Sequence, residues 1–201
     1  MRTLVGMTSE QESSRWADAA TVIGTFVGVL WLLEMIDQIA NNRLDGLGIE
    51  PREADGLWGI LFAPLLHSGW GHLAANTLPL LILGFLILMS GITVWARATA
   101  IIWVVGGVGT WLTGGENTLH LGASVLIFGW LVFLIMRGFF NRSVGQILIG
   151  LVVLAIYGSI LWGVFPGTPG VSWQGHLFGA IGGGLAAFWM AERGPRVPAT
   201  V

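Results

Sequence analysis

The sequence predicts an all-α membrane protein built as a bundle of six transmembrane helices. The first observation is its composition: 54% of the 201 residues are hydrophobic and only 10% are charged, whereas a soluble domain carries about 25% charged residues. The second is that the apolar residues gather into six runs, each near the ~20 residues that cross a bilayer as a helix. The third is that the eleven tryptophans lie mostly near the ends of these runs, as in an aromatic belt at a membrane interface.

Each predicted helix corresponds to one of these runs. Residues 1–16 are polar and predict a short cytoplasmic tail, which leaves residues 17–201 as a single six-helix membrane domain. The predicted spans are 19–40, 72–90, 94–112, 118–136, 144–163 and 172–191. Between the first two spans, the long loop Asn41–Gly71 contains an apolar piece, Leu57–His67, that is short and interrupted by proline. This piece predicts an interfacial or re-entrant segment, since loops of this length are usually functional.

The arginines predict the orientation of the bundle. If the N-terminus is cytoplasmic, seven of the nine arginines fall on the cytoplasmic side, and only Arg43 and Arg52 fall outside. The opposite topology reverses this count, so the positive-inside rule favours the first. Six spans then place the C-terminus in the cytoplasm as well. We expect a multi-pass integral membrane protein of a bacterial or archaeal cell membrane.

Several classes of function are excluded by composition. The net charge of −2 offers no basic patch for a nucleic acid. The chain has no cysteine, and all nine basic residues are arginines, which excludes a thiol nucleophile and a Ser–Lys dyad. There is no His-Glu-x-x-His motif for a zinc protease. We therefore expect neither a cofactor nor a metal ion.

Polar side chains inside the predicted spans are few, and such residues are costly in lipid and tend to be functional. His72 and Asn76 are four residues apart and so share one face of the second predicted helix. Ser124 lies about five residues into the fourth predicted helix and His176 about four into the sixth, which puts both ~6–8 Å below the helix starts. Since the even-numbered helices all run from the outside inward, these four side chains are expected to meet near the outer face.

A hydroxyl and an imidazole at one level are the minimum for nucleophilic acyl transfer. His176 would take the proton of Ser124 and later give it to the leaving amine. The Asn76 amide, the His72 ring and a backbone N–H near Ser124 could stabilise the oxyanion of the tetrahedral intermediate. Glu116 lies in a loop and is a poor third member of a triad, so a Ser–His dyad is the more economical interpretation.

Three motifs surround these four residues. They are His72-Leu-Ala-Ala-Asn76, Gly122-Ala123-Ser124 with Gly129, and His176-Leu-Phe-Gly179-Ala-Ile-Gly-Gly183. Together they resemble the rhomboid intramembrane serine proteases in residue, spacing, order and helix number. The resemblance implies Ser124 as nucleophile, His176 as general base, and His72 and Asn76 with the Ser124 backbone amide as the oxyanion site. It also implies that His67 lies in a loop that dips toward the site, and that single-span membrane proteins are cleaved in or near their transmembrane segments.

The chain departs from the family pattern at two positions. Val125 replaces the usual glycine after the serine, which puts the shape of the substrate groove in doubt. Phe128 replaces a tyrosine one turn below the serine, so this ring is expected to pack against His176 without a hydrogen bond.

The uncharged loop Gly163–Gly170, with three glycines and two prolines, predicts a movable cap in which Phe165 plugs the mouth of the site.

Two alternatives to a protease follow from the same residues. A small polytopic transporter or channel would need polar groups through the full depth of the bundle, but the inner halves of the second, fourth and sixth runs are almost wholly apolar. A catalytically inactive rhomboid-like binder of transmembrane clients would typically lack the serine or the histidine, and this chain keeps both. Each polar residue by itself is also compatible with a plain interhelical hydrogen bond.

Overall fold

The computed structural model describes residues 9–191, and every regular element in that range is helical, which confirms the predicted all-α class. The α-helices are α1 (Ser9–Ile39), α2 (Gly59–Phe62), α3 (Trp70–Leu88), α4 (Ile92–Thr113), α5 (Ser124–Phe140), α6 (Val144–Tyr157) and α7 (Trp173–Trp189). Short 3₁₀ turns lie at Asp45–Leu47, Asp55–Leu57, Ala63–Leu65 and Gly158–Val164. Helix α1 begins at Ser9, within the segment predicted as a tail, and residues 1–8 of that segment lie outside the described residues.

Within residues 9–191, four helical stretches are long and apolar enough to cross a bilayer: Gln11–Ile39, Trp70–Leu88, Ile92–Thr113 and Val144–Val164. Helices α5 and α7 have 17 residues each, or roughly 26 Å at 1.5 Å per residue, slightly less than the ~30 Å of a hydrocarbon core. The structure thus has the helices of a membrane bundle, while six complete spans and their orientation stay predictions.

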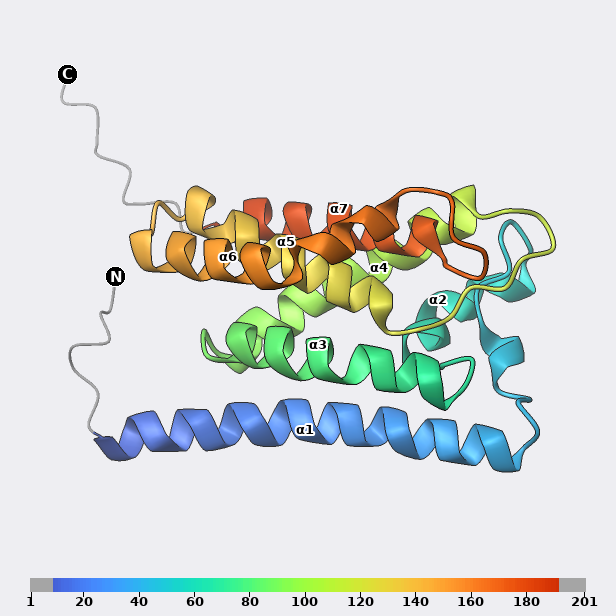
Figure 1. The fold of residues 1–201 in the computed structure, drawn as a ribbon, viewed down its shortest axis with the longest axis horizontal. Helices are drawn as coiled ribbons and strands as arrows, with labels where there is room; N and C mark the ends of the chain where they lie inside the picture. The colour runs from blue at the N-terminus through green and yellow to red at the C-terminus, as the bar shows by residue number, and fades with distance from the viewer. Residues whose placement is uncertain (1–8, 192–201) are drawn as a thin grey trace, which may run out of the picture.

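Helix α5 lies at the centre of the bundle and packs against α3, α4, α6 and α7. Ten of its 17 residues are buried, including Leu126, Trp130 and Leu131, which are fully inaccessible. Helix α1 lies on one flank and packs along α3 (Figure 1). Helix α6 is on the outside, where Leu148, Val152 and other aliphatic side chains are more than half exposed. An apolar surface this large is stable only against lipid or another protein.

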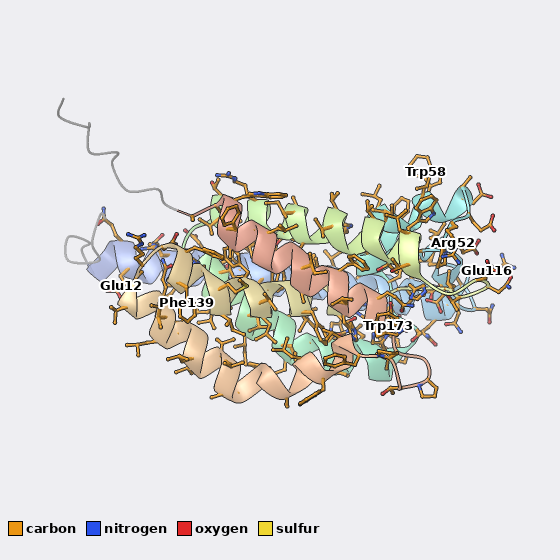
Figure 2. All side chains as sticks on the ribbon, turned by 90° about the horizontal axis from the view of Figure 1, so that it is seen from above. Glu12, Arg52, Trp58, Glu116, Phe139 and Trp173 are labelled. Carbon is orange, nitrogen blue, oxygen red and sulfur yellow. The ribbon has the colours of Figure 1, made fainter. Side chains whose placement is uncertain are left out.

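Polar atoms gather at the two ends of the bundle. In Figure 2, Arg52, Trp58 and Glu116 lie at one end, Glu12 and Phe139 lie at the other, and the side chains between the ends are mostly carbon. The last turn of α1 and the first turn of α7 lie at the end that carries Arg52 (Figures 1 and 2). This distribution is typical of a protein whose middle is surrounded by hydrocarbon.

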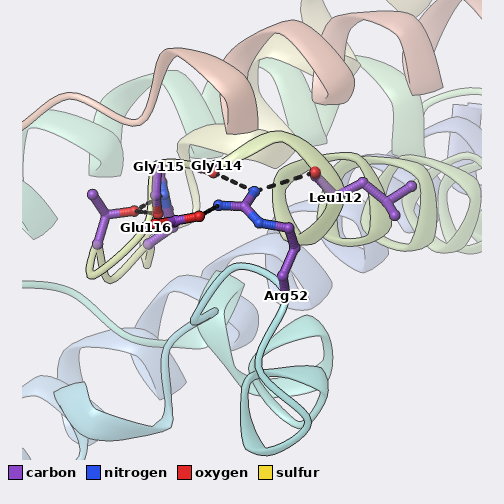
Figure 3. Close-up of polar contacts among 7 residues, drawn as sticks. Arg52, Leu112, Gly114, Gly115 and Glu116 are labelled. Atoms are coloured by element: carbon purple, nitrogen blue, oxygen red, sulfur yellow. Dashed lines mark hydrogen bonds and ion pairs between the residues drawn. The ribbon is translucent and has the colours of Figure 1, made fainter.

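The first loop does not span, as predicted, but folds into short helical turns against the end of the bundle. Helix α2 packs on α4, and the Trp103 indole N–H donates to the Ile60 carbonyl at 2.8 Å. The Arg52 guanidinium donates to the Gly114 carbonyl at 2.7 Å and pairs with Glu116 at 4.0 Å (Figure 3). The loop is therefore tied to α4 and to the start of the connection that follows it.

Buried carboxylates join the start of this loop to the end of α1. Glu34 and Asp37 are each 2% exposed, and the Asp37 carboxylate accepts the Leu44 backbone N–H at 2.6 Å. Burial, followed by the negative charges of Asp37 and Glu34, raises the pKa of Asp45 to about 6. A backbone N–H of the loop thus satisfies one oxygen of a carboxylate that is buried at the end of α1.

The start of α5 differs from its sequence prediction. The apolar run begins at residue 118, but residues 118–123 lie outside the helix and Ser124 is its first residue. The His120 backbone pairs with Ile49 of the first loop through two hydrogen bonds of 2.8 and 3.0 Å. Gly122 has φ +124°, a conformation that only glycine adopts readily. An apolar sequence pattern cannot show whether a segment is helical or is paired with a distant loop.

Helices α5 and α7 approach backbone to backbone through glycines. A Cβ atom added to Gly183 would lie 2.0 Å from the Gly129 carbonyl oxygen, and one added to Gly179 would lie 2.3 Å from that of Val125. Small residues at four-residue spacing permit this separation. The glycine face of α7 therefore packs directly on the helix that begins at Ser124.

Candidate active site

The structure brings Ser124 and His176 into direct contact. Ser124 is the first residue of α5 and His176 lies in the first turn of α7, and the Ser124 Oγ to His176 Nε2 distance is 2.9 Å. The other ring nitrogen, Nδ1, lies 3.0 Å from the Gly163 carbonyl oxygen. Because a carbonyl only accepts, Nδ1 carries the proton and Nε2 is the free acceptor. The serine hydroxyl therefore donates to the histidine, as a general base requires.

The imidazole of His176 is held between two neighbours. Phe128 stacks on it with ring centroids 4.0 Å apart and an angle of 7° between the ring planes, which confirms the predicted packing without a hydrogen bond. Gly163 closes another side, since a Cβ atom there would meet Phe128 at 2.9 Å and His176 Nδ1 at 3.1 Å. These contacts restrict the rotation of the ring and keep Nε2 directed at Ser124.

Within the described part of the chain, no carboxylate takes the place of a third triad residue. The partner of His176 Nδ1 is a backbone carbonyl, and the Glu116 side chain is 85% exposed beside Arg52. The low rank that the sequence gives Glu116 is thus consistent with its position. The described residues also contain no group of three or more His, Asp or Glu side chains arranged to hold a metal ion.

His72 and Asn76 lie in the first two turns of α3, next to the serine loop. A Cβ atom built on Gly122 would meet His72 Nε2 at 2.9 Å and Ser124 Oγ at 3.7 Å, so the His72 ring and the serine hydroxyl flank one small space. Asn76 is 6% exposed, and its Nδ2 is buried with no hydrogen-bond partner among the described residues. An unpaired buried donor typically costs about 1–3 kcal/mol, which a bound acceptor would recover.

His67 supports the loop that leads to Ser124. It is 1% exposed, it lies edge-on to His72, and its Nε2 accepts the Ala123 backbone N–H at 3.4 Å. Burial, and secondarily the neighbouring His72, lowers the pKa of His67 to about 3. His67 is therefore a neutral acceptor, placed where the resemblance implies a loop that dips toward the site.

A cavity of about 20 Å³ lies beside Ser124, large enough for roughly one water molecule. Its wall includes Gly122, Ser124, Val125, Thr110, His120 and Ser172. The branched Val125 side chain fits because it faces two glycines: a Cβ atom on Gly106 would lie 2.3 Å from Val125 Cγ2, and one on Gly179 would lie 3.1 Å from it. Val125 thus packs between α4 and α7 while also lining the cavity.

The prediction that Phe165 plugs the site is wrong for this structure. Phe165 is 60% exposed and its ring lies near Trp162, with centroids 5.8 Å apart. The residue of this loop that reaches the site is Gly163, through its carbonyl. Sequence reasoning also missed the contact between His120 and Ser172, and the only signal for it is that all four histidines occur near the same ends of predicted spans.

Comparisons with known proteins agree with these observations. The family model described as the Rhomboid domain matches residues 54–193. An uncharacterized protein of Mycobacterium tuberculosis is 52% identical over 192 residues, which cover 92% of this chain and 80% of the relative. An uncharacterized protein of Mycobacterium leprae is 46% identical over 198 residues, covering 93% and 78%. A Bacillus subtilis protein named "Putative rhomboid protease YdcA" is 31% identical over 185 residues, covering 88% and 90%. No solved structure matches.

Proposed function

The chain belongs to the rhomboid family, and we propose that it is an intramembrane serine protease using a Ser124–His176 dyad. Its substrates in this proposal are single-span membrane proteins, cleaved in or near their transmembrane segments. The observation that carries the proposal is the 2.9 Å contact between Ser124 Oγ and His176 Nε2. This nitrogen is unprotonated because the ring proton is on Nδ1, where it is donated to the Gly163 carbonyl. The four apolar helical stretches and the bacterial relatives support a multi-pass protein of a bacterial or archaeal cell membrane.

The proposed reaction has two steps. Ser124 Oγ attacks the scissile carbonyl carbon while its proton passes to His176 Nε2, and the resulting imidazolium gives this proton to the leaving amine. A water molecule, deprotonated by the same Nε2, then attacks the acyl-serine carbonyl. The bond to Ser124 Oγ breaks, the acid leaves, and the proton returns from Nε2 to Oγ. The Gly163 carbonyl keeps the reactive tautomer in place and stabilises the imidazolium that forms in each step. The small cavity beside Ser124 supports the proposal, since the second step needs a water-sized space.

Three donors are available for the oxyanion. Ser124 is the first residue of α5, so its backbone N–H has no partner within the helix, and the positive end of the helix dipole lies there. The buried Asn76 Nδ2 has no other described partner, and the His72 ring is near Gly122 and Ser124. Preorganised donors of this kind are usually the largest electrostatic contribution to acyl transfer.

The apolar core argues against the transport alternative. Below the site, the packed faces of α3 and α5 carry Leu80, Leu83, Ile87, Leu131 and Leu134, which are 0–2% exposed. A conduction path would need polar groups or water at that depth. The retained contact of Ser124 with His176 argues against an inactive binder.

The direct test is covalent labelling of the purified protein. A fluorophosphonate probe should modify Ser124 in detergent or in liposomes, with the adduct located by mass spectrometry. Cleavage of a single-span substrate in liposomes should be inhibited in proportion to labelling. Absence of both labelling and cleavage in folded protein would leave the inactive binder as the better description.

The donor residues give a second measurement. We expect Asn76→Ala and His72→Ala each to lower kcat/KM by ~10²–10³, the usual effect of losing one oxyanion donor. The melting temperature of Asn76→Ala should change little, because Asn76 Nδ2 has no described partner to lose. Thr77→Ala is a matched control on the same helix, since its hydroxyl bonds to Leu73 and to Trp31 on the side of α1. Unchanged turnover per folded molecule in both site variants would contradict the assignment.

A further inference from the structure

His120 connects three parts of the molecule that the dyad depends on. Its backbone pairs with Ile49 of the first loop in both directions. Its side chain, in a residue that is only 9% exposed, lies between Thr118 and Ser172. The distance from His120 Nδ1 to Ser172 Oγ is 2.7 Å, and that from Nε2 to Thr118 Oγ1 is 2.8 Å.

The directions of these hydrogen bonds follow from the acceptors at their ends. The Thr118 hydroxyl donates to the Gly115 carbonyl at 2.7 Å, so its oxygen must accept the Nε2–H of His120. His120 Nδ1 is then an acceptor and takes the hydroxyl proton of Ser172, whose oxygen accepts the Gly175 N–H at 3.3 Å. Burial lowers the pKa of His120, which favours the neutral form that this chain of bonds requires.

The hydrogen bonds of His120 connect two segments, and each segment leads to one member of the dyad. His120 is four residues before Ser124, in the non-helical segment that leads into α5. Ser172 caps α7, and its carbonyl accepts the His176 N–H at 3.1 Å. The link therefore joins the backbone that directs Ser124 to the first turn of the helix that carries His176.

The glycine contacts of α5 and α7 do not fix the position of the backbone before Ser124. They begin at Val125 and Gly179 and continue to Gly129 and Gly183, below the dyad, so they set the distance between the two helix bodies. Ser124 is the first helical residue, and the residues before it belong to a loop outside the helix. The direction of its Oγ depends on where the loop is held, and a misplacement of about 1 Å can cost ~10²-fold in rate.

We propose that His120 is a positioning residue of the active site, which holds the serine loop against the N-cap of α7 through its Nδ1 bond to Ser172. This inference rests on the proposed protease function and assigns His120 no contact with substrate. The hydrogen bond to Thr118 orients the His120 ring, and the hydrogen bond to Ser172 holds the serine loop in place against α7. Loss of the second bond should therefore affect the chemical step more than substrate binding.

Two substitutions separate the two bonds. The amide group of His120→Asn occupies the position of Nδ1 and can accept from Ser172, whereas that of His120→Gln occupies the position of Nε2 and reaches only Thr118. We expect His120→Ala and His120→Gln to lower kcat by ~10–100-fold with KM changed less than ~3-fold, and His120→Asn to stay within ~3-fold of wild type. Ser172→Ala should resemble His120→Ala, and the double variant should be no worse than the poorer single variant.

The rate of fluorophosphonate labelling of Ser124 distinguishes a positioning role from a purely structural one, because substituting a purely structural residue would not change this rate per folded molecule. Its rate per folded molecule should fall with kcat in the Ala and Gln variants, because a small probe does not need the binding surface for a transmembrane substrate. Thr99→Val is the matched control: it removes the buried bond from the Trp130 indole at 3.0 Å, on the contact of α4 with α5. We expect it to lower the melting temperature without changing the labelling rate.

The outcomes separate this inference from the proposed function. If the wild type cleaves and labels but the Asn and Gln variants are equally active, His120 is not a positioning residue and the protease proposal stands. The same conclusion follows if activity falls in all variants, Thr99→Val included, in step with melting temperature. If the wild type neither cleaves nor labels, both proposals fail. Should His120→Ala not fold, the Asn–Gln pair and Ser172→Ala decide the question.

Discussion

Ser124→Ala is expected to abolish cleavage of a single-span substrate, with a fall in kcat on the order of 10⁴–10⁶-fold. The variant loses the nucleophile, and nothing else within the described residues offers a hydroxyl to His176 Nε2. His176→Ala should be equally inactive, because base and nucleophile act as a unit and either loss costs nearly the whole effect. Turnover in liposomes and labelling by a fluorophosphonate measure the two losses.

Two further variants make this result specific. His176→Gln retains a polar group near the position of Nε2 but cannot accept the proton as a base, so it should be as inactive as His176→Ala. Ser90→Ala removes a hydroxyl that accepts from Arg137 at 2.8 Å in the turn between α3 and α4, and it should cleave normally. Near-normal turnover by Ser124→Ala would refute the protease proposal.

Substituting the glycines between α5 and α7 should have the second largest effect. An alanine in a helix is ordinarily more stable than glycine by about 0.5–1 kcal/mol. At Gly183, however, the added methyl group would lie 2.0 Å from a backbone oxygen of α5, and at Gly179 it would lie 2.3 Å from another. Backbone cannot rotate away as a side chain can, so the helices must separate, at a cost of about 1–3 kcal/mol or more.

The sign of the change in melting temperature distinguishes the glycines at the helix contact from other glycines. We expect Gly183→Ala and Gly179→Ala to lower the melting temperature in detergent, and Gly179→Ala also to lower turnover, since it lies one turn after His176. Gly184→Ala is the matched control in the same helix: its methyl group would be 3.4 Å from the flexible Met136 Sδ, so its stability should be equal or higher. If all three variants were equally stable, the backbone contact of α5 and α7 would be incorrect.

The comparison of sequence with structure shows where pattern-based reasoning ends. The helical class and the non-spanning first loop follow from composition and spacing, because lipid leaves a spanning chain few alternatives to helices. The start of α5 does not follow from them, since the predicted run begins at residue 118 whereas the backbones of His120 and Gly122 are paired with the first loop. The position of Phe165 against Trp162 and the bond of His120 to Ser172 likewise depend on segments distant in sequence.

The sequence by itself determined which side chains are available for chemistry: one serine and one histidine at the start of two helices, a histidine and an asparagine on a third, no cysteine and no lysine. It determined this because polar groups inside apolar runs are few and helical periodicity assigns them to faces and levels. Only the tertiary structure decided the protonated nitrogen of His176, the exclusion of Glu116 and the link through His120. Each of these depends on hydrogen bonds or an ion pair between residues that are 13 to more than 50 positions apart, which no local pattern specifies.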